Sequence, residues 1–149
     1  MIIMPLNRLG RSVRKNNMQK HNILGIGLLW FSAIVFIVYG LFGFFNPNIP
    51  ADFGGLQMIN GNGYAEIGAM YGGLQIGFGF FCLLSALRND FYKAGLALLT
   101  IAIGSLALGR LFNAVATTDA LSIYTYGALI YEFITALLAA MVLRFHTKP

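Results

Sequence analysis

Four long apolar runs constrain this chain more than any other feature of its sequence. They cover roughly residues 23–45, 65–87, 94–113 and 122–143. A helix of about 20 apolar residues crosses the hydrocarbon core of a bilayer, which is about 30 Å thick. Only 10% of the 149 residues are charged, against about 25% in a soluble domain. We therefore predict an all-α integral membrane protein, in which residues 23–145 form a four-transmembrane-helix bundle.

These spans leave little sequence for a soluble domain, a metal site or a cofactor site. The connections between them are short, so a soluble catalytic domain does not fit between residues 23 and 145. Cys82 is the single cysteine, which excludes an intrachain disulfide and a cysteine-rich metal site. Both histidines, His21 and His146, lie just outside the spans. We predict no metal ion and no other cofactor, and we favour a non-enzymatic protein over an enzyme.

The basic residues are distributed on one side of the predicted bundle. Nine of the ten precede the first span, separate the second from the third, or follow the fourth: Arg8, Arg11, Arg14, Lys15, Lys20, Arg88, Lys93, Arg144 and Lys148. Cytoplasmic segments are enriched in Lys and Arg. The distribution predicts a basic cytoplasmic tail (residues 1–22) and both termini in the cytoplasm of a bacterial inner-membrane protein. It also explains the pI of about 9.6 without a nucleic acid as partner.

Two segments beside the first span have alternative interpretations. The basic tail and the apolar run also resemble a signal peptide, but the run is long and ends at Asn46–Pro47 without a small-residue cleavage site. We expect the first span not to be cleaved off and to remain in the mature protein. Translation could start at Met1 or at Met18. Residues 46–63, the longest connection, are too apolar for a fully solvated loop. They predict a short interfacial segment over the outer mouth of the bundle, or else a surface loop with aromatic anchors.

The stretch Tyr64–Leu87, which contains the second span, is rich in glycine, and the third span contains further glycines. Small residues allow transmembrane helices to approach one another closely. Residues three or four positions apart share one face of a helix. We predict that helices pack at five of these glycines: Gly72, Gly73, Gly77, Gly104 and Gly109.

Three charged residues lie inside spans: Glu66 in the second, Arg110 in the third and Glu132 in the fourth. At about 1.5 Å per residue from the cytoplasmic ends, they stand roughly 33, 25 and 18 Å up, in the outer half of the membrane. A charge that faces lipid costs about 2.5–3.5 kcal/mol near the centre. We therefore predict that Arg110 pairs across helices with Glu66, Glu132 or both. Uncharged polar side chains at similar depth extend this polar cluster: Tyr71, Gln75, Asn113 and Tyr131.

The polar cluster has three interpretations. In the simplest, the charges only lock the helices in register. In the second, the cluster lines an outward-opening pocket for a small molecule, a lipid headgroup or a proton, because fixed polar groups in an apolar wall are typical of binding sites. In the third, it meets a partner subunit. All three remain open at this point.

The pattern Glu66-x4-Tyr71-Gly72-Gly73-x-Gln75-x-Gly77-x-Gly79, with Gly104-x4-Gly109-Arg110 in the third span, resembles a family of small four-helix bacterial inner-membrane proteins catalogued as a domain of unknown function. The resemblance covers about residues 23–145. It implies a four-helix inner-membrane protein and supplies no activity. More distantly, the layout is similar to DoxX-like four-helix membrane proteins, some of which are linked to redox or quinone partners; this is a likeness of fold alone.

Three functions are compatible with these features. A non-enzymatic inner-membrane protein, either an accessory subunit or a binder of lipid, quinone or another small molecule, agrees best with the small size. A small transporter or proton-coupled carrier would have to work as an oligomer, because four helices are few for alternating access. An intramembrane enzyme would use Glu66 or Glu132 as an acid or base. The partners we expect are the bilayer, further copies of the chain or a larger membrane complex, and a bound lipid or quinone.

Overall fold

The structure is a computed structural model that describes residues 22–146; residues 1–21, which hold the basic tail, and residues 147–149 lie outside it. Within the described residues all regular structure is helical, without a strand. Four helices are long and apolar enough to cross a membrane. These observations confirm the prediction of an all-α, four-span membrane protein.

Each predicted span corresponds to one helical rod. The first is α2 (Ile23–Phe45), which the short helix α3 (Asn48–Gly54) follows. The second consists of α4 (Gly61–Ile67), the π-helical turn η1 (Gly68–Gly73) and α5 (Leu74–Leu87). The third consists of the 3-10 turn η2 (Asn89–Phe91), α6 (Tyr92–Leu98), the π-helical turn η3 (Leu99–Ile103) and α7 (Gly104–Ala116). The fourth is α8 (Ile123–His146).

The connection after the first span contains the short helix α3 over one end of the bundle; its place at the membrane interface stays a prediction. Pro50 and Ala51 are buried, whereas Phe53 is half exposed. Gly55 ends this helix with φ 66°, a left-handed conformation that glycine adopts without strain. The second span then begins at Gly61, earlier than expected, because the Asn60 side chain accepts the backbone N–H groups of the first turn at 3.0 and 3.2 Å.

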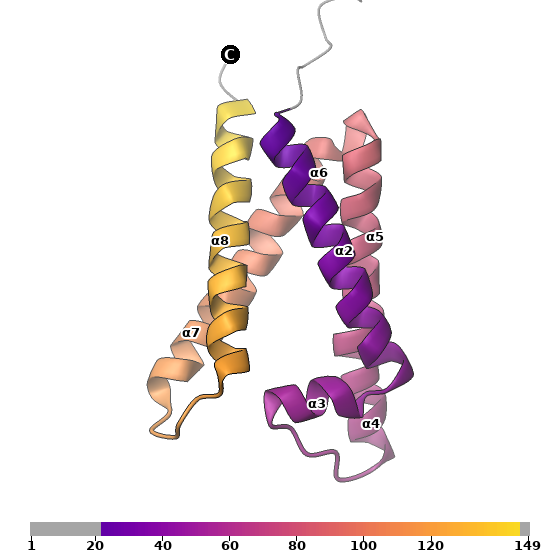
Figure 1. The fold of residues 1–149 in the computed structure, drawn as a ribbon, viewed down its shortest axis with the longest axis vertical. Coiled ribbons are helices and arrows are strands. Elements are labelled where there is room, and N and C mark those ends of the chain that lie inside the picture. The colour runs from indigo at the N-terminus through magenta and orange to yellow at the C-terminus, as the bar shows by residue number, and fades with distance from the viewer. Residues whose placement is uncertain (1–21, 147–149) are drawn as a thin grey trace, which may run out of the picture.

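The spans form two pairs that meet at one end and spread apart at the other (Figure 1). One pair is α2 with the second span, which pack along most of their length. The other is α8 with the third span, in which η3 and α7 both pack against α8. At the end where the pairs separate, which we call the α3 end, α3 lies across the bundle and contacts both α2 and α8.

The hydrophobic core fills the opposite end, where α2 begins and α8 ends. All four spans supply it with buried side chains: Leu28, Leu29, Ala33, Phe36, Cys82, Tyr92, Leu96, Leu99, Ile103, Ala139 and Val142. Many large apolar side chains instead face outward, including Phe112 at 74% exposure and Ile130 at 60%. An apolar belt of this kind, on four helices long enough to cross a bilayer, is typical of a surface that faces lipid. The chain is therefore a multi-pass membrane protein.

Glycines bring α2 and the second span into backbone contact. A Cβ added at Gly43 would lie 2.5 Å from the Tyr71 carbonyl oxygen, and one at Gly72 would lie 2.6 Å from the Phe44 nitrogen. Gly40 and Gly79 stand in similar contacts along the same crossing. The packing role predicted for Gly72 agrees with this geometry.

Three of the five predicted packing glycines do not lie at a contact between helices of the described chain. A Cβ at Gly73, Gly77 or Gly109 would meet no atom of the described neighbours within 4 Å, so the prediction that helices pack there is wrong. Gly104 faces α8 at ordinary van der Waals distance: a Cβ added to it would lie 3.5 Å from the Ala136 Cβ.

The π-helical turn η1 explains part of this error. A π turn closes with i→i+5 hydrogen bonds and contains about one residue more than an α turn. One extra residue rotates everything beyond it by about 100° around the helix axis. Ideal α-helical spacing would place Glu66, Gly73 and Gly77 on one face of the second span, and η1 interrupts this spacing at Gly68–Gly73.

Candidate functional site

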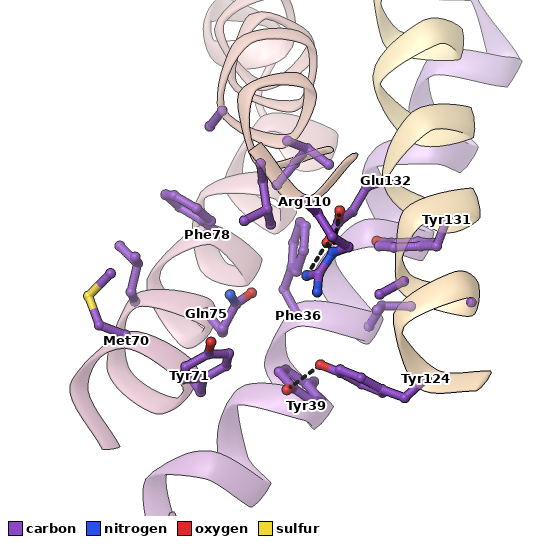
Figure 2. A pocket seen from close by; sticks show the side chains of 17 residues that line it. Phe36, Tyr39, Met70, Tyr71, Gln75, Phe78, Arg110, Tyr124, Tyr131 and Glu132 are labelled. Carbon is purple, nitrogen blue, oxygen red and sulfur yellow. Dashed lines mark hydrogen bonds and ion pairs between the residues drawn. The ribbon is translucent and has the colours of Figure 1, made fainter. Parts of the chain in front are cut away.

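A cavity of about 640 Å³ lies among all four spans, with walls from α2, η1, α5, η3, α7 and α8 (Figure 2). Most of its lining is aliphatic or aromatic. Its volume falls within the range of about 300–1,000 Å³ that is usual for small-molecule sites. A few polar side chains interrupt the apolar walls: Tyr39, Tyr71, Gln75, Arg110, Tyr124, Tyr131 and Glu132.

An ion pair between α7 and α8 forms the charged part of the wall. The Nη2 group of Arg110 donates to Oε1 of Glu132 at 2.7 Å, and Nε donates to Oε1 and Oε2 at 3.2 and 3.0 Å. The Glu132 side chain is only 6% exposed, whereas that of Arg110 is 24% exposed. The predicted pairing of Arg110 across helices is confirmed, with Glu132 as the partner.

Small residues on both helices permit this pairing. Ala107, one turn before Arg110, is fully buried. Ala136, one turn after Glu132, is buried and faces Gly104 at van der Waals distance. Because α7 and α8 can approach at these positions, the two charged side chains meet without reaching across lipid.

A second polar contact joins α2 to α8 nearer the α3 end. The hydroxyl groups of Tyr39 and Tyr124 lie 2.8 Å apart and form a hydrogen bond. The ring of Phe53, on α3, stacks on Tyr124 with a centroid distance of 5.6 Å and an interplanar angle of 24°. Together these rings connect α3, α2 and α8, and Figure 2 shows the Tyr39–Tyr124 bond at the cavity. Tyr39 and Tyr124 are not among the predicted site residues, although counting along their spans places both near the α3 end.

Gln75 and Tyr71 enter the cavity from the second span, opposite the ion pair (Figure 2). Tyr131 lines it from α8, where its ring packs edge-on against Phe31 and Phe36 at 6.2 and 6.4 Å. The structure therefore brings five of the seven predicted cluster residues to one cavity. Whether they bind a ligand stays a prediction.

Asn113 stands in an adjacent hollow of about 480 Å³. This hollow shares Tyr71, Leu106 and Arg110 with the first, so the guanidinium stands between the two. Asn113 is exposed, and its amide donates to the Gly109 carbonyl oxygen of its own helix at 2.8 Å. Asn113 therefore extends the polar surface beyond Arg110. Its amide bonds to its own helix and not to the Arg110–Glu132 pair.

Glu66 does not join the cluster. It is exposed on α4, it lines neither hollow, and no described residue forms a hydrogen bond or ion pair with its carboxylate. The prediction of Glu66 as an alternative partner for Arg110 is therefore wrong. The reason is geometric, because the second span separates from α7 toward the α3 end and η1 interrupts the α-helical register between Glu66 and the cavity.

The cavity is open along one side of the bundle. Met70 and Leu74 on the second span and Leu106 on α7 line it, yet they are 47%, 41% and 43% exposed. These residues form an open rim between the second span and α7, at a level where the surrounding belt is apolar.

A family model described as a domain of unknown function (DUF4345) matches residues 26–143. The match includes every residue that lines the cavity. No curated protein and no solved structure matches the chain. The resemblance to an uncharacterised family is thereby confirmed, whereas the likeness to DoxX-like proteins and the motif stay predictions.

Proposed function

Because the chain belongs to the DUF4345 family, for which no function is described, we propose a function from its geometry: it is a non-enzymatic inner-membrane protein that binds a lipid, a quinone or another small amphiphilic molecule between its spans. The observation that carries this proposal is a cavity of about 640 Å³ with an ion pair in an otherwise largely apolar wall. The chain would then serve a larger membrane complex as an accessory subunit that binds this molecule.

The composition of the wall supports an amphiphilic ligand. Phe36, Leu74 and Phe78 offer apolar surface, which favours a hydrocarbon chain or ring. Arg110 and Gln75 offer fixed hydrogen-bonding groups for a polar end. The open rim gives access from the bilayer, where such molecules concentrate.

Filling the cavity tests the proposal. Gly127 lines the cavity, and a Cβ added there would meet no described atom within 4 Å, so Gly127→Leu is chosen to place a larger side chain at the wall. Gly73→Leu is the matched control, because Gly73 is equally open and lines neither hollow. We expect Gly127→Leu to lower the amount of co-purifying ligand by about tenfold and Gly73→Leu to leave it unchanged. The measurement is mass spectrometry of solvent extracts from protein purified in mild detergent.

Equal ligand content in both variants and the unmodified protein would contradict the proposal. The cavity would then be packed by bulk lipid, and the ion pair would act as a structural brace between α7 and α8.

A carrier that acts as an oligomer is the second candidate. One observation favours it: Arg110 stands between two hollows, as a group on a transport path would. The packed core at the opposite end of the bundle opposes it, because a path would have to cross that core. Purification as a homo-oligomer, with uptake of a labelled substrate into vesicles that Arg110→Gln abolishes, would favour the carrier over the binder.

The orientation that the basic residues favour is part of the proposal: both termini in the cytoplasm and the α3 end outside. Gln57 and Asn89 are exposed and lie at opposite ends of the second span. We expect Gln57→Cys, but not Asn89→Cys, to react with an impermeant maleimide in intact cells with a permeabilised outer membrane. Cys82 is fully buried and gives no background. Labelling of Asn89→Cys alone would reverse the orientation.

A further inference from the structure

The Arg110–Glu132 pair leaves one side of the guanidinium unused. The carboxylate occupies the edge formed by Nε and Nη2. Among residues 22–146, no oxygen accepts a hydrogen bond from Nη1, whose two N–H groups are therefore free. Since Arg110 lines both hollows and remains 24% exposed, these donors are available to a molecule in the cavity.

The two hollows carry no net charge in their described walls. Arg110 and Glu132 are the only charged residues that line either of them, and they neutralise each other. An anionic ligand that approached Nη1 would stand beside the Glu132 carboxylate and be repelled by it. A cationic ligand would meet the guanidinium, because both oxygens of Glu132 are already bonded and buried.

On the premise of the proposed function, we propose that the ligand has an electrically neutral polar end with a carbonyl-type acceptor, which the free N–H groups of Arg110 bind. Glu132 then acts as a positioning residue that orients the guanidinium and cancels its charge. The ester carbonyl of a monoacylglycerol and the ring carbonyl of an alkylated quinone share this chemistry. Gln75, from the facing wall, offers a further amide to the same polar end.

Competition binding on the unmodified full-length protein tests this without any variant. The probe is a tritiated monoacylglycerol in detergent micelles, and its displacement is measured by scintillation proximity. We expect unlabelled monoacylglycerol or an alkylated benzoquinone to compete about tenfold better than an alkyl sulfate or an alkyl trimethylammonium of equal chain length, which corresponds to about 1.4 kcal/mol. The stronger of the two neutral competitors identifies the source of the carbonyl.

A charge change at Glu132 should reverse the ranking. In Glu132→Gln the guanidinium keeps a hydrogen-bonding neighbour but loses its counter-charge, so we expect the alkyl sulfate to gain about tenfold. In the double variant Arg110→Gln with Glu132→Gln, we expect the monoacylglycerol to lose about tenfold without a gain for the sulfate. Gly73→Leu, outside both hollows, serves as the control for purification and folding.

The outcomes separate this inference from the proposed function. An alkyl sulfate that competes best with the unmodified protein would overturn the neutral ligand and leave a ligand-binding cavity standing. An absence of binding by every probe, together with an unchanged ligand content in Gly127→Leu, would overturn both.

Discussion

Replacing Arg110 by methionine should lower the free energy of unfolding by about 3–5 kcal/mol, because the change leaves a buried carboxylate without its partner. The Glu132 side chain is only 6% exposed and receives all of its described hydrogen bonds from Arg110. Methionine keeps much of the aliphatic volume, so the loss reports the missing charge more than missing packing. The measurement is denaturation in mild detergent, followed by circular dichroism.

A second substitution identifies the partner. Adding Glu132→Gln to Arg110→Met should recover part of the loss, since it removes the stranded charge. Glu66→Gln is the matched control: Glu66 is exposed and lines neither hollow, so its effect should stay within about 0.5 kcal/mol and it should not rescue Arg110→Met. Rescue by Glu66→Gln, or no coupling to Glu132, would contradict the ion pair described above.

Two neighbouring glycines should respond to alanine with opposite signs. A Cβ at Gly72 would lie 2.6 and 2.7 Å from the backbone nitrogen and Cα of Phe44, which cannot move without separating α2 from the second span. We expect Gly72→Ala to destabilise the protein by about 1–3 kcal/mol. Gly73→Ala meets open space and should stabilise the helix by about 0.5–1 kcal/mol. Thermal denaturation in one detergent compares the two variants directly.

Equal melting temperatures for the two alanine variants would show that α2 and the second span do not cross at Gly43 and Gly72. A destabilised Gly73→Ala would instead place the opposite face of the second span against another helix or another copy of the chain. The single-residue offset between the substitutions excludes general effects of a larger side chain.

The spans and the ion pair could be predicted because each depends on a large energy that the sequence displays directly. A run such as residues 23–45 has hardly any polar group to satisfy outside a membrane. Arg110 and Glu132 would each be costly in lipid, so they had to meet. The count of residues from the helix ends was enough to place them at comparable depth, because one extra residue in the π-helical turn η3 changes the depth of Arg110 by only about 1.5 Å.

The packing face of the second span could not be predicted, because it depends on small differences in backbone geometry. The π-helical turn at Gly68–Gly73 changes the rotation of the helix, and nothing in the residue types of that segment distinguishes it from an α turn. Gly72 and Gly73 have the same side chain, yet only Gly72 meets α2. Glu66 was misplaced for a related reason: its depth suits Arg110, but the helices diverge before they reach it.

The open rim at Met70, Leu74 and Leu106 determines in which units the affinity of a ligand has to be expressed. A molecule that enters through hydrocarbon is drawn from the lipid phase, so occupancy follows its mole fraction among lipids and not its concentration in water. The acyl chains of every annular lipid compete for the same walls, and only the polar end discriminates among them. Excess detergent therefore lowers occupancy by dilution, so the variants and the unmodified protein have to be compared after the same brief purification at one detergent-to-lipid ratio.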